Sequence, residues 1–244
     1  MNYRFTVQYD GSRYDGWQRQ GNTDNTVQGR IESVLSRLTG ETVEIHGAGR
    51  TDAGVHAEGQ VASARLPGNR SAAEIMDYLN RYLPEDIAVV SVQEADERFH
   101  ARLSAAGKVY RYEIRMGSVP DVFRRKYQYR VEQRLDVAAM REAAQYLTGT
   151  HDYRAFCSNK RYKKSTVRTV RAIDMDVNGD NLVITFRGDG FLYNMVRILT
   201  GTLLEVGMGE RKAEDMPGIL ASLDRARAGK TAPAQGLTLV QVEY

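Results

Sequence analysis

The stretch GAGRTDAGVHAEG, residues 47–59, contains four glycines, and Arg50, Thr51 and Asp52 lie near its centre. Glycine at this density indicates that the backbone turns tightly or that another group approaches it closely. Asp52 would stand on such a loop open to a ligand, and Arg50 is near enough to hold a carboxylate ionised or to bind a phosphate. The other interpretation is a polar turn with Asp52 as a local hydrogen-bonding residue. A simple turn, however, needs fewer special residues than this run contains.

This loop joins two expected strands, with a strand and a helix before them and a helix and a strand after them. Asn25 with Gln28, and Ser71 with Glu74, have the spacing of capping boxes, and Gly40 is placed to end the first helix. The last strand is apolar and β-branched, so we expect it to be buried on both faces. The order matches the split βαβ, ferredoxin-like arrangement. The elements are expected at residues 3–9, 25–40, 42–46, 60–66, 71–84 and 87–92.

The second half mixes strands and helices in a similar order. Asn178-Gly179-Asp180 is a strong hairpin turn, and Asp136 is placed to cap a helix. The sequence therefore predicts an α+β protein with two related halves, residues 1–104 and 105–244, whose sheets face a common cleft or join. The N-terminal half would carry the Asp52 loop. Strands are expected at residues 108–115, 123–131, 167–177, 182–187 and 236–242, and helices from 136 to near 149, at 191–206 and at 212–223.

The composition excludes several classes of protein. The 244 residues are 42% hydrophobic, which supports a core, and the single cysteine, Cys157, excludes an internal disulfide. The N-terminus has no apolar signal-peptide core, and no run approaches the roughly 18 apolar residues of a membrane helix. We therefore expect a soluble, cytoplasmic protein.

Cations and aromatic residues cluster between residues 123 and 171, although the formal net charge of the chain is only +3. Cations on phosphates and rings on bases are the usual chemistry of RNA binding. The other interpretation is a set of solvated strand faces with tyrosines half in the core, and it is preferable for any one stretch. Because several such stretches cluster, we give nucleic-acid binding and solvated strand faces equal weight. The stretches are residues 123–130, 153–164 and 167–171.

Other kinds of catalytic site fit the sequence poorly. His46, His56 and Asp52 could be considered as metal ligands, but no HxH or HExxH spacing occurs. A lone GxG at residues 207–209 has no third glycine, and neither a P-loop nor a GxSxG motif is present. We expect no metal site and no dinucleotide site.

Several motifs match one family, in order over essentially the whole chain. AGRTDAGVHA at residues 48–57 resembles the signature of the tRNA pseudouridine synthase A family. The glycine loop is highly specific, whereas KVYRY would be weak alone. The other matching motifs are YDGSRYDGWQRQ at residues 9–20, NTVQGRIE at 25–32, KVYRY at 108–112, DGFLYNMVR at 189–197 and GLTLV at 236–240.

The resemblance implies two ferredoxin-like (βαββαβ-type) halves with antiparallel sheets around a central basic cleft, in agreement with the strand order. It implies isomerisation of uridine to pseudouridine in the tRNA anticodon arm, at nucleotides thirty-eight to forty. It also implies a homodimer in which one tRNA contacts both subunits, and no cofactor.

The reaction calls for a carboxylate that attacks as a nucleophile or takes a proton, in a pocket that protects the intermediate from water. Asp52 is the expected catalytic residue. By the resemblance, Arg197 pairs with this carboxylate and Tyr110 stacks on the uracil. Arg50 would hold the backbone of the flipped nucleotide, and Leu237 would line the pocket. Each of these residues has another interpretation. Tyr110 could be a core tyrosine, and Arg197 an exposed arginine on a helix. Asp52 could belong to a polar turn, and Leu237 could simply pack in the core.

Two other functions remain open on the residues alone. One is a non-catalytic RNA-binding module, which would need the aromatics and cations but no Asp among glycines. The other is a metal-free hydrolase that uses Asp52 on a nucleoside. Analysis of the product distinguishes the three functions. An isomerase gives an isomer of unchanged mass, a hydrolase gives a free base, and a binding module gives no product.

Overall fold

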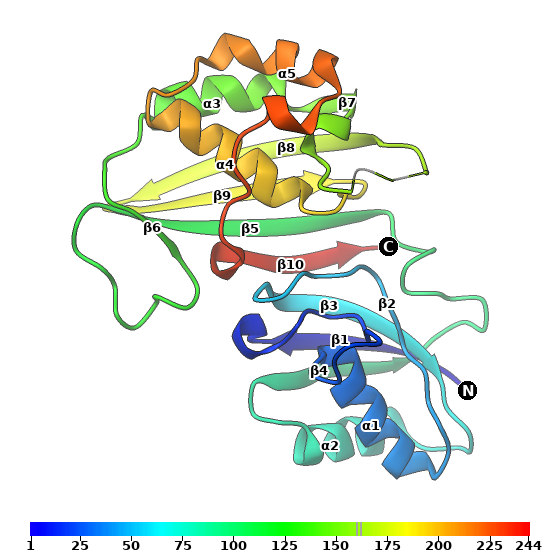
Figure 1. Ribbon diagram of the computed structural model, residues 1–244. Coiled ribbons are helices and arrows are strands. Elements are labelled where there is room, and N and C mark those ends of the chain that lie inside the picture. Colours follow the sequence, from blue (N-terminus) through cyan, green and yellow to red (C-terminus); the bar gives the residue numbers. More distant parts are fainter. Residues whose placement is uncertain (160, 162) are drawn as a thin grey trace. The chain divides into compact units, whose positions relative to one another are not determined.

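The computed structural model describes residues 1–159, 161 and 163–244 of the chain. These residues form two compact units (Figure 1). The first unit comprises Met1–Ala106 together with Thr238–Tyr244, and the second comprises Gly107–Leu237. The last strand of the chain therefore packs mainly with the N-terminal residues.

The first unit has a mostly antiparallel sheet in the order β4-β1-β3-β10, with β2 paired to β3. β1 is antiparallel to β3 and β4, whereas β10 runs parallel to β3, with Thr238 opposite His56. The predicted order of strands and helices is observed. The elements are β1 (Asn2–Tyr9), α1 (Val27–Thr39), β2 (His46–Gly47), β3 (His56–Arg65), α2 (Ala72–Tyr82), β4 (Ile87–Glu94) and β10 (Leu237–Glu243).

The core of the first unit lies between this sheet and its two helices, which lie side by side (Figure 1). Phe5 and Val7 alternate with polar residues along β1, and Ile31 and Leu35 are one turn apart on α1, so each pair shares one face. These four side chains are at most 1% exposed. Burial of each stabilises the unit by about 1.5–3 kcal/mol.

The helix ends follow local capping signals. The side chain of Thr26, not Asn25, caps α1, so the predicted Asn25 capping box is wrong by one residue. Gly40 ends α1 with a φ of 76°, which only glycine adopts without cost. The capping box of Ser71 and Glu74 is confirmed at the start of α2.

The strand that enters the Asp52 loop is shorter than predicted, because β2 contains only His46 and Gly47. The backbone N–H of Val43 donates to Ser36 Oγ (3.0 Å), and that of Ile45 donates to Glu32 Oε1 (2.9 Å). Side-chain oxygens of α1 thus accept hydrogen bonds from backbone N–H groups that would otherwise pair with a neighbouring strand.

The prediction that β4 is buried on both faces is wrong. Ile87 and Val89 are buried, but Val90 is exposed. β4 is the outermost strand of its sheet, and α2 packs against it. An edge strand covered by one helix needs only one apolar face.

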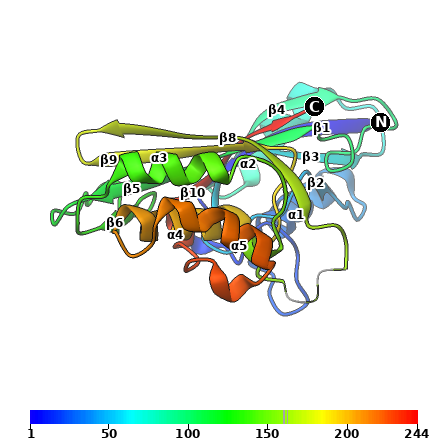
Figure 2. The ribbon, with the colours of Figure 1, turned by 90° about the horizontal axis from the view of Figure 1, so that it is seen from above.

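The second unit is a sheet in the order β5-β9-β8-β7, with β6 parallel to β5. Its three helices pack on one face of this sheet (Figures 1 and 2). The predicted hairpin is confirmed, with Asn178 opposite Asn181 across the turn. The elements are β5 (Gly107–Met116), β6 (Tyr129–Val131), α3 (Val137–Tyr146), β7 (Gly149–Asp152), β8 (Val167–Asn178), β9 (Asn181–Gly188), α4 (Met195–Gly207) and α5 (Met216–Ser222).

Two elements of the second unit differ from prediction. The strand expected at residues 123–131 is reduced to β6, because residues 118–128 form a loop over most of that length. The helix expected from residue 191 begins only at Met195, because Asn194 has a φ of 61°, outside the helical region. From Met195 onward nearly every residue of α4 is buried, as a helix that is apolar all round should be.

The protein is therefore of the mixed α+β class, with mostly antiparallel sheets and five α-helices among the described residues. No helix in the described part of the chain has both the length and the apolar character to cross a membrane.

Candidate active site

Asp52 lies on the loop between β2 and β3, which is shorter than the glycine-rich stretch because β3 already begins at His56. Gly54 has a φ of 78°, and the backbone N–H of Val55 donates to the Asp52 carbonyl (3.1 Å). The chain therefore reverses direction directly after Asp52. Asp52 is half-buried at this turn.

The segment that follows β1 holds the Asp52 loop in place. The backbone N–H of Trp17 donates to the Thr51 carbonyl (3.0 Å), and the N–H of Gly54 donates to the Tyr14 carbonyl (3.4 Å). The hydroxyl of Tyr9 lies 2.8 Å from Thr51 Oγ1. The motif at residues 9–20 and the glycine-rich loop thus meet in space and form one structural unit around Asp52.

The aromatic side chains of this segment belong to the core. Trp17 is buried and lies against Tyr9, with 5.8 Å between the ring centroids. Trp17 is therefore a packed residue and not a base-stacking surface. Burial raises the pKa of Tyr9 far above its usual range, so its hydroxyl keeps its proton next to Thr51.

Two glycines of this segment are required because the segment and the Asp52 loop approach each other closely. A Cβ on Gly11 would overlap the carbonyl of Val55. A Cβ on Gly16 would lie 2.7 Å from the carbonyl oxygen of Thr51, and Gly16 also has a φ of 99°. Larger residues at either position would push the Asp52 loop away.

His56 supports the loop from its C-terminal side. The backbone N–H of Gly11 donates to His56 Nδ1 (3.0 Å). The same nitrogen lies 3.2 Å from Asp10 Oδ1. The sequence offered His56 only as a weak metal candidate, and its positioning role was missed. Within the described residues no three His, Cys, Asp or Glu side chains gather as a metal site requires.

Gln60 is a second residue that sequence reasoning missed. Its amide is fully buried, and Nε2 donates to the Gly49 carbonyl (2.9 Å). A glutamine on the same strand face as Ala62 and Ala64 is the signal that could have indicated this role, because a buried amide needs a partner.

Arg50 is exposed, and its Nε donates to Gln18 Oε1 (2.7 Å). This bond uses one of the five N–H donors of the guanidinium. Arg50 and Asp52 are thus presented by one rigidly held loop.

Tyr110 lies on β5 of the second unit and is buried. Its ring meets the edge of Phe191, with 5.3 Å between centroids and 87° between planes. Phe186 lies opposite Tyr110 in the β5–β9 register. The ring is thereby fixed in orientation, as both a core tyrosine and a stacking platform would be.

Arg197 lies in the first turn of α4. Its Nε donates to the Ala232 carbonyl (2.7 Å) and its Nη1 donates to Asn194 Oδ1 (3.0 Å). Asn194 also donates to Ser158 Oγ (3.2 Å) and adopts a left-handed conformation that costs energy in most residues. Asn194 is therefore a positioning residue for Arg197, and nothing in the sequence indicated this role, because the helix was expected to include Asn194.

Leu237 is buried at the start of β10. The five predicted site residues are divided between the two units: Asp52 and Arg50 lie on one loop of the first, and Tyr110, Arg197 and Leu237 lie in the second. Their assembly into one pocket stays a prediction.

The basic and aromatic stretches differ in where their rings lie. Tyr153 and Phe156 are fully buried, so they are core residues. Phe123 is 91% exposed. Lys160 and Tyr162 lie outside the described residues. Exposed cations of these stretches are Arg124, Arg125, Lys126, Arg154, Arg161, Lys163, Lys164 and Arg171.

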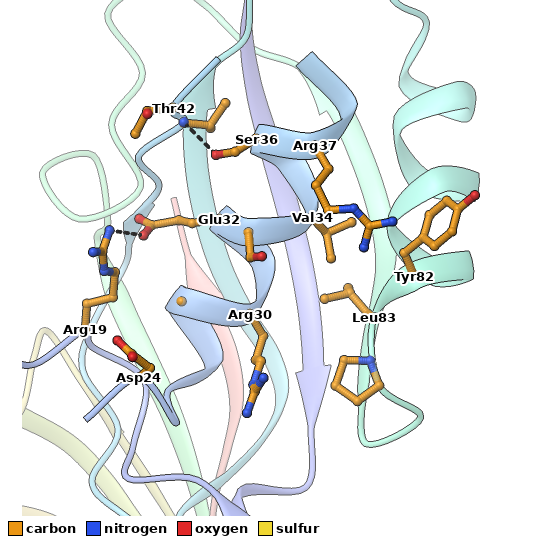
Figure 3. A pocket seen from close by; sticks show the side chains of 14 residues that line it. Arg19, Asp24, Arg30, Glu32, Val34, Ser36, Arg37, Thr42, Tyr82 and Leu83 are labelled. Carbon is orange, nitrogen blue, oxygen red and sulfur yellow. Dashed lines mark hydrogen bonds and ion pairs between the residues drawn. The ribbon is translucent and has the colours of Figure 1, made fainter. Parts of the chain in front are cut away.

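A pocket of about 690 Å³ lies beside α1 and contains none of the predicted site residues (Figure 3). Its lining has both charge signs, with Arg19 paired to Glu32 (3.1 Å) and Arg37 stacked over Tyr82 (4.9 Å to the ring centroid). These four lining side chains therefore bind one another in pairs.

A family model described as tRNA pseudouridine synthase matches residues 6–103 and 143–244 of the chain. Curated proteins named tRNA pseudouridine synthase A are similar over the full length. The protein from Bacillus sp. (strain KSM-64) is 48% identical over 243 residues, covering 100% of this chain and 99% of its own. That of Brevibacillus brevis is 48% identical over 241 residues (99% and 98%), and that of Acetivibrio thermocellus is 46% identical over 247 residues (100% and 99%).

Among solved structures, a chain of a Cbf5-Nop10-Gar1 complex aligns with 98% of this chain and 49% of its own length. The TM-score is 0.42 and the sequence identity 15%. At that level the similarity adds nothing to the full-length matches.

Proposed function

Because this chain belongs to the tRNA pseudouridine synthase family, we propose that it isomerises uridine to pseudouridine in the anticodon arm of tRNA, at nucleotides thirty-eight to forty, with Asp52 as the catalytic carboxylate. The observation that carries this proposal is the Asp52 loop, which is bound through backbone and side chain to the segment after β1. A catalytic group needs this kind of fixed support.

The reaction breaks the bond between ribose and N1 of uracil, turns the base, and joins the ribose to C5. C5 releases its proton and N1, freed from the ribose, takes up a proton, so the mass is unchanged. In this proposal Asp52 attacks as a nucleophile or takes a proton. No redox step and no cofactor is needed.

The other predicted residues have separate roles in the proposal. Arg197 holds the Asp52 carboxylate ionised, and its own orientation is supported by Ala232 and Asn194. Tyr110 stacks on the uracil, and Leu237 lines the pocket. Arg50 binds the backbone of the extruded nucleotide, whose extrusion costs a few kcal/mol.

We also propose that both halves are ferredoxin-like, with residues 1–104 carrying the catalytic loop and residues 105–244 completing a central basic cleft. The order β4-β1-β3, with β2 on the other side of β3, supports this for the first half. The proposal includes a homodimer that binds one tRNA through both subunits, and a cytoplasmic location where tRNA is processed.

Tritium release tests the reaction and the residue together. Unmodified tRNA transcribed with uridine labelled at C5 is incubated with wild type, Asp52→Asn and the control Asp24→Asn. Asp24 is exposed and undergoes the same chemical change. We expect release by wild type and Asp24→Asn, and a rate several orders of magnitude lower for Asp52→Asn with tRNA binding retained.

Ordinary turnover by purified Asp52→Asn would contradict the assignment of Asp52. No release by wild type, with tRNA still bound, would favour the binding-module alternative. A free base in the product would favour the hydrolase.

A further inference from the structure

The loop at residues 118–128, between β5 and β6, has an unusual surface that the proposed reaction does not use. Val119, Val122, Phe123 and Tyr127 are 68%, 56%, 91% and 40% exposed. Phe123 is the most exposed large hydrophobic residue among the described part of the chain. We call this segment the Phe123 loop.

Phe123 projects from a turn that is held by hydrogen bonds. Asp121 Oδ1 accepts from the backbone N–H groups of Phe123 and Arg124, at 3.1 Å each. Arg124 is also ion-paired with Glu113, which is buried on β5. Leaving an aromatic ring in water is unfavourable, yet the turn holds this one outward.

The base of the loop is tied to the unit as well. Gln235 Nε2 donates to the backbone carbonyls of Arg125 (3.4 Å) and Gln128 (3.0 Å). Tyr127 N–H closes a turn onto the Arg124 carbonyl (2.8 Å). The side chain of Phe123 is therefore presented on a framework fixed at both ends.

The charge around Phe123 indicates the kind of partner. Residues 118–130 contain four cations, Arg124, Arg125, Lys126 and Arg130, and one carboxylate, Asp121. Arg125 and Lys126, two and three residues after Phe123 in the chain, are exposed. Lysine is depleted from the centres of protein–protein interfaces, whereas an aromatic ring flanked by cations fits an unpaired base and its phosphates.

We propose that Phe123 stacks on an unpaired base of the tRNA while Arg125 and Lys126 contact the neighbouring phosphates. The proposal rests on the proposed function for the identity of the RNA. It assigns to the Phe123 loop a binding role, separate from the reacting uridine.

The test compares tRNA affinity for Phe123→Ala, Phe123→Leu and Phe123→Trp in the full chain. We expect the dissociation constant to rise about 5- to 100-fold for Ala, the scale of one base–aromatic stack, to rise for Leu as well, and to stay near wild type for Trp. A matched control is Tyr146→Ala, which removes an exposed ring on α3. Affinity for a fully paired RNA duplex should not respond to Phe123→Ala.

Two further readouts separate stacking from charge. Trp17 is the chain's single tryptophan and is buried, so a tryptophan introduced at position 123 reports stacking as fluorescence quenching by tRNA. The double substitution Arg125→Gln and Lys126→Gln should lower the slope of log affinity against log salt by about one per lost phosphate contact. Phe123→Ala should leave that slope unchanged.

Unchanged tRNA affinity of Phe123→Ala, or wild-type affinity of Phe123→Leu, would overturn the proposal. So would a change in sedimentation of Phe123→Ala in the absence of RNA, which would assign the loop to contact between copies of the chain. Tritium release at saturating enzyme is measured separately. Its absence in wild type would overturn the proposed reaction without altering the Phe123 binding result.

Discussion

At the scale of single residues, the position of Asp52 depends on neighbours that are absent from its own motif. Gly11 and Gly16 allow the segment after β1 to touch the Asp52 loop, and Tyr9 bonds the hydroxyl of Thr51. The carboxylate is placed by contacts to a segment about 40 residues earlier, and a substitution there should act on Asp52 through the backbone.

Gly11→Ala should lower stability and activity together. The added methyl would overlap the Val55 carbonyl, and overpacking of this kind costs about 1–3 kcal/mol. Urea unfolding and tritium release measure the two effects. Gly21→Ala is the control, because nothing lies within 4 Å of its added Cβ. Equal stability of Gly11→Ala and wild type would show that the loop shifts without cost.

At the scale of elements, α1 organises the entrance to the Asp52 loop. The buried Glu32 on this helix accepts from Gln28 Nε2 (2.8 Å), Ile45 N–H (2.9 Å) and Arg19 Nη1 (3.1 Å). One carboxylate therefore joins the helix, the strand leading to Gly47, and the segment after Trp17.

Glu32→Gln should destabilise the protein by about 2–4 kcal/mol, because an amide presents N–H donors to groups that are themselves donors. Chemical unfolding compares it with Ser33→Ala, an exposed change on the same helix. A loss no greater than that of the control would mean that water or another side chain replaces the carboxylate.

At the scale of the whole molecule, each unit has a core of its own, and each core contains a buried phenol. Tyr9 lies in the first unit and Tyr112 in the second, and desolvation by burial raises the pKa of both far above the usual range. The Tyr112 hydroxyl donates to the Pro233 carbonyl (2.7 Å). Both folded units therefore favour the protonated phenol.

Alkaline pH should unfold the protein. Above about pH 10 an unfolded tyrosine loses its proton while the buried one keeps it, so the unfolded state binds fewer protons and stability falls as pH rises. The full contribution is present below about pH 10, and each such tyrosine lowers stability by about 1.4 kcal/mol per pH unit above it. Urea unfolding between pH 9 and 11.5 measures the slope, which Tyr9→Phe should make shallower. An unaltered slope would contradict the role of Tyr9.

Much of the fold and the family could be predicted from local signals. Ser71 with Glu74, Gly40 and the Asn178 hairpin were confirmed because each depends on atoms within a few residues. The comparisons confirm the resemblance that the glycine loop indicated. The roles of the five site residues stay predictions.

The sequence by itself determined the order of the elements, the loop that bears Asp52 and the family, because periodicity, caps and motifs are properties of neighbouring residues. Only the tertiary structure decided which distant groups accept the backbone N–H groups of Val43 and Ile45, and that α4 begins at Met195 rather than at Phe191. It also decided that Trp17 packs inside while Phe123 stands in solvent. Both sit beside cations in sequence, and burial depends on what the rest of the chain brings against each ring.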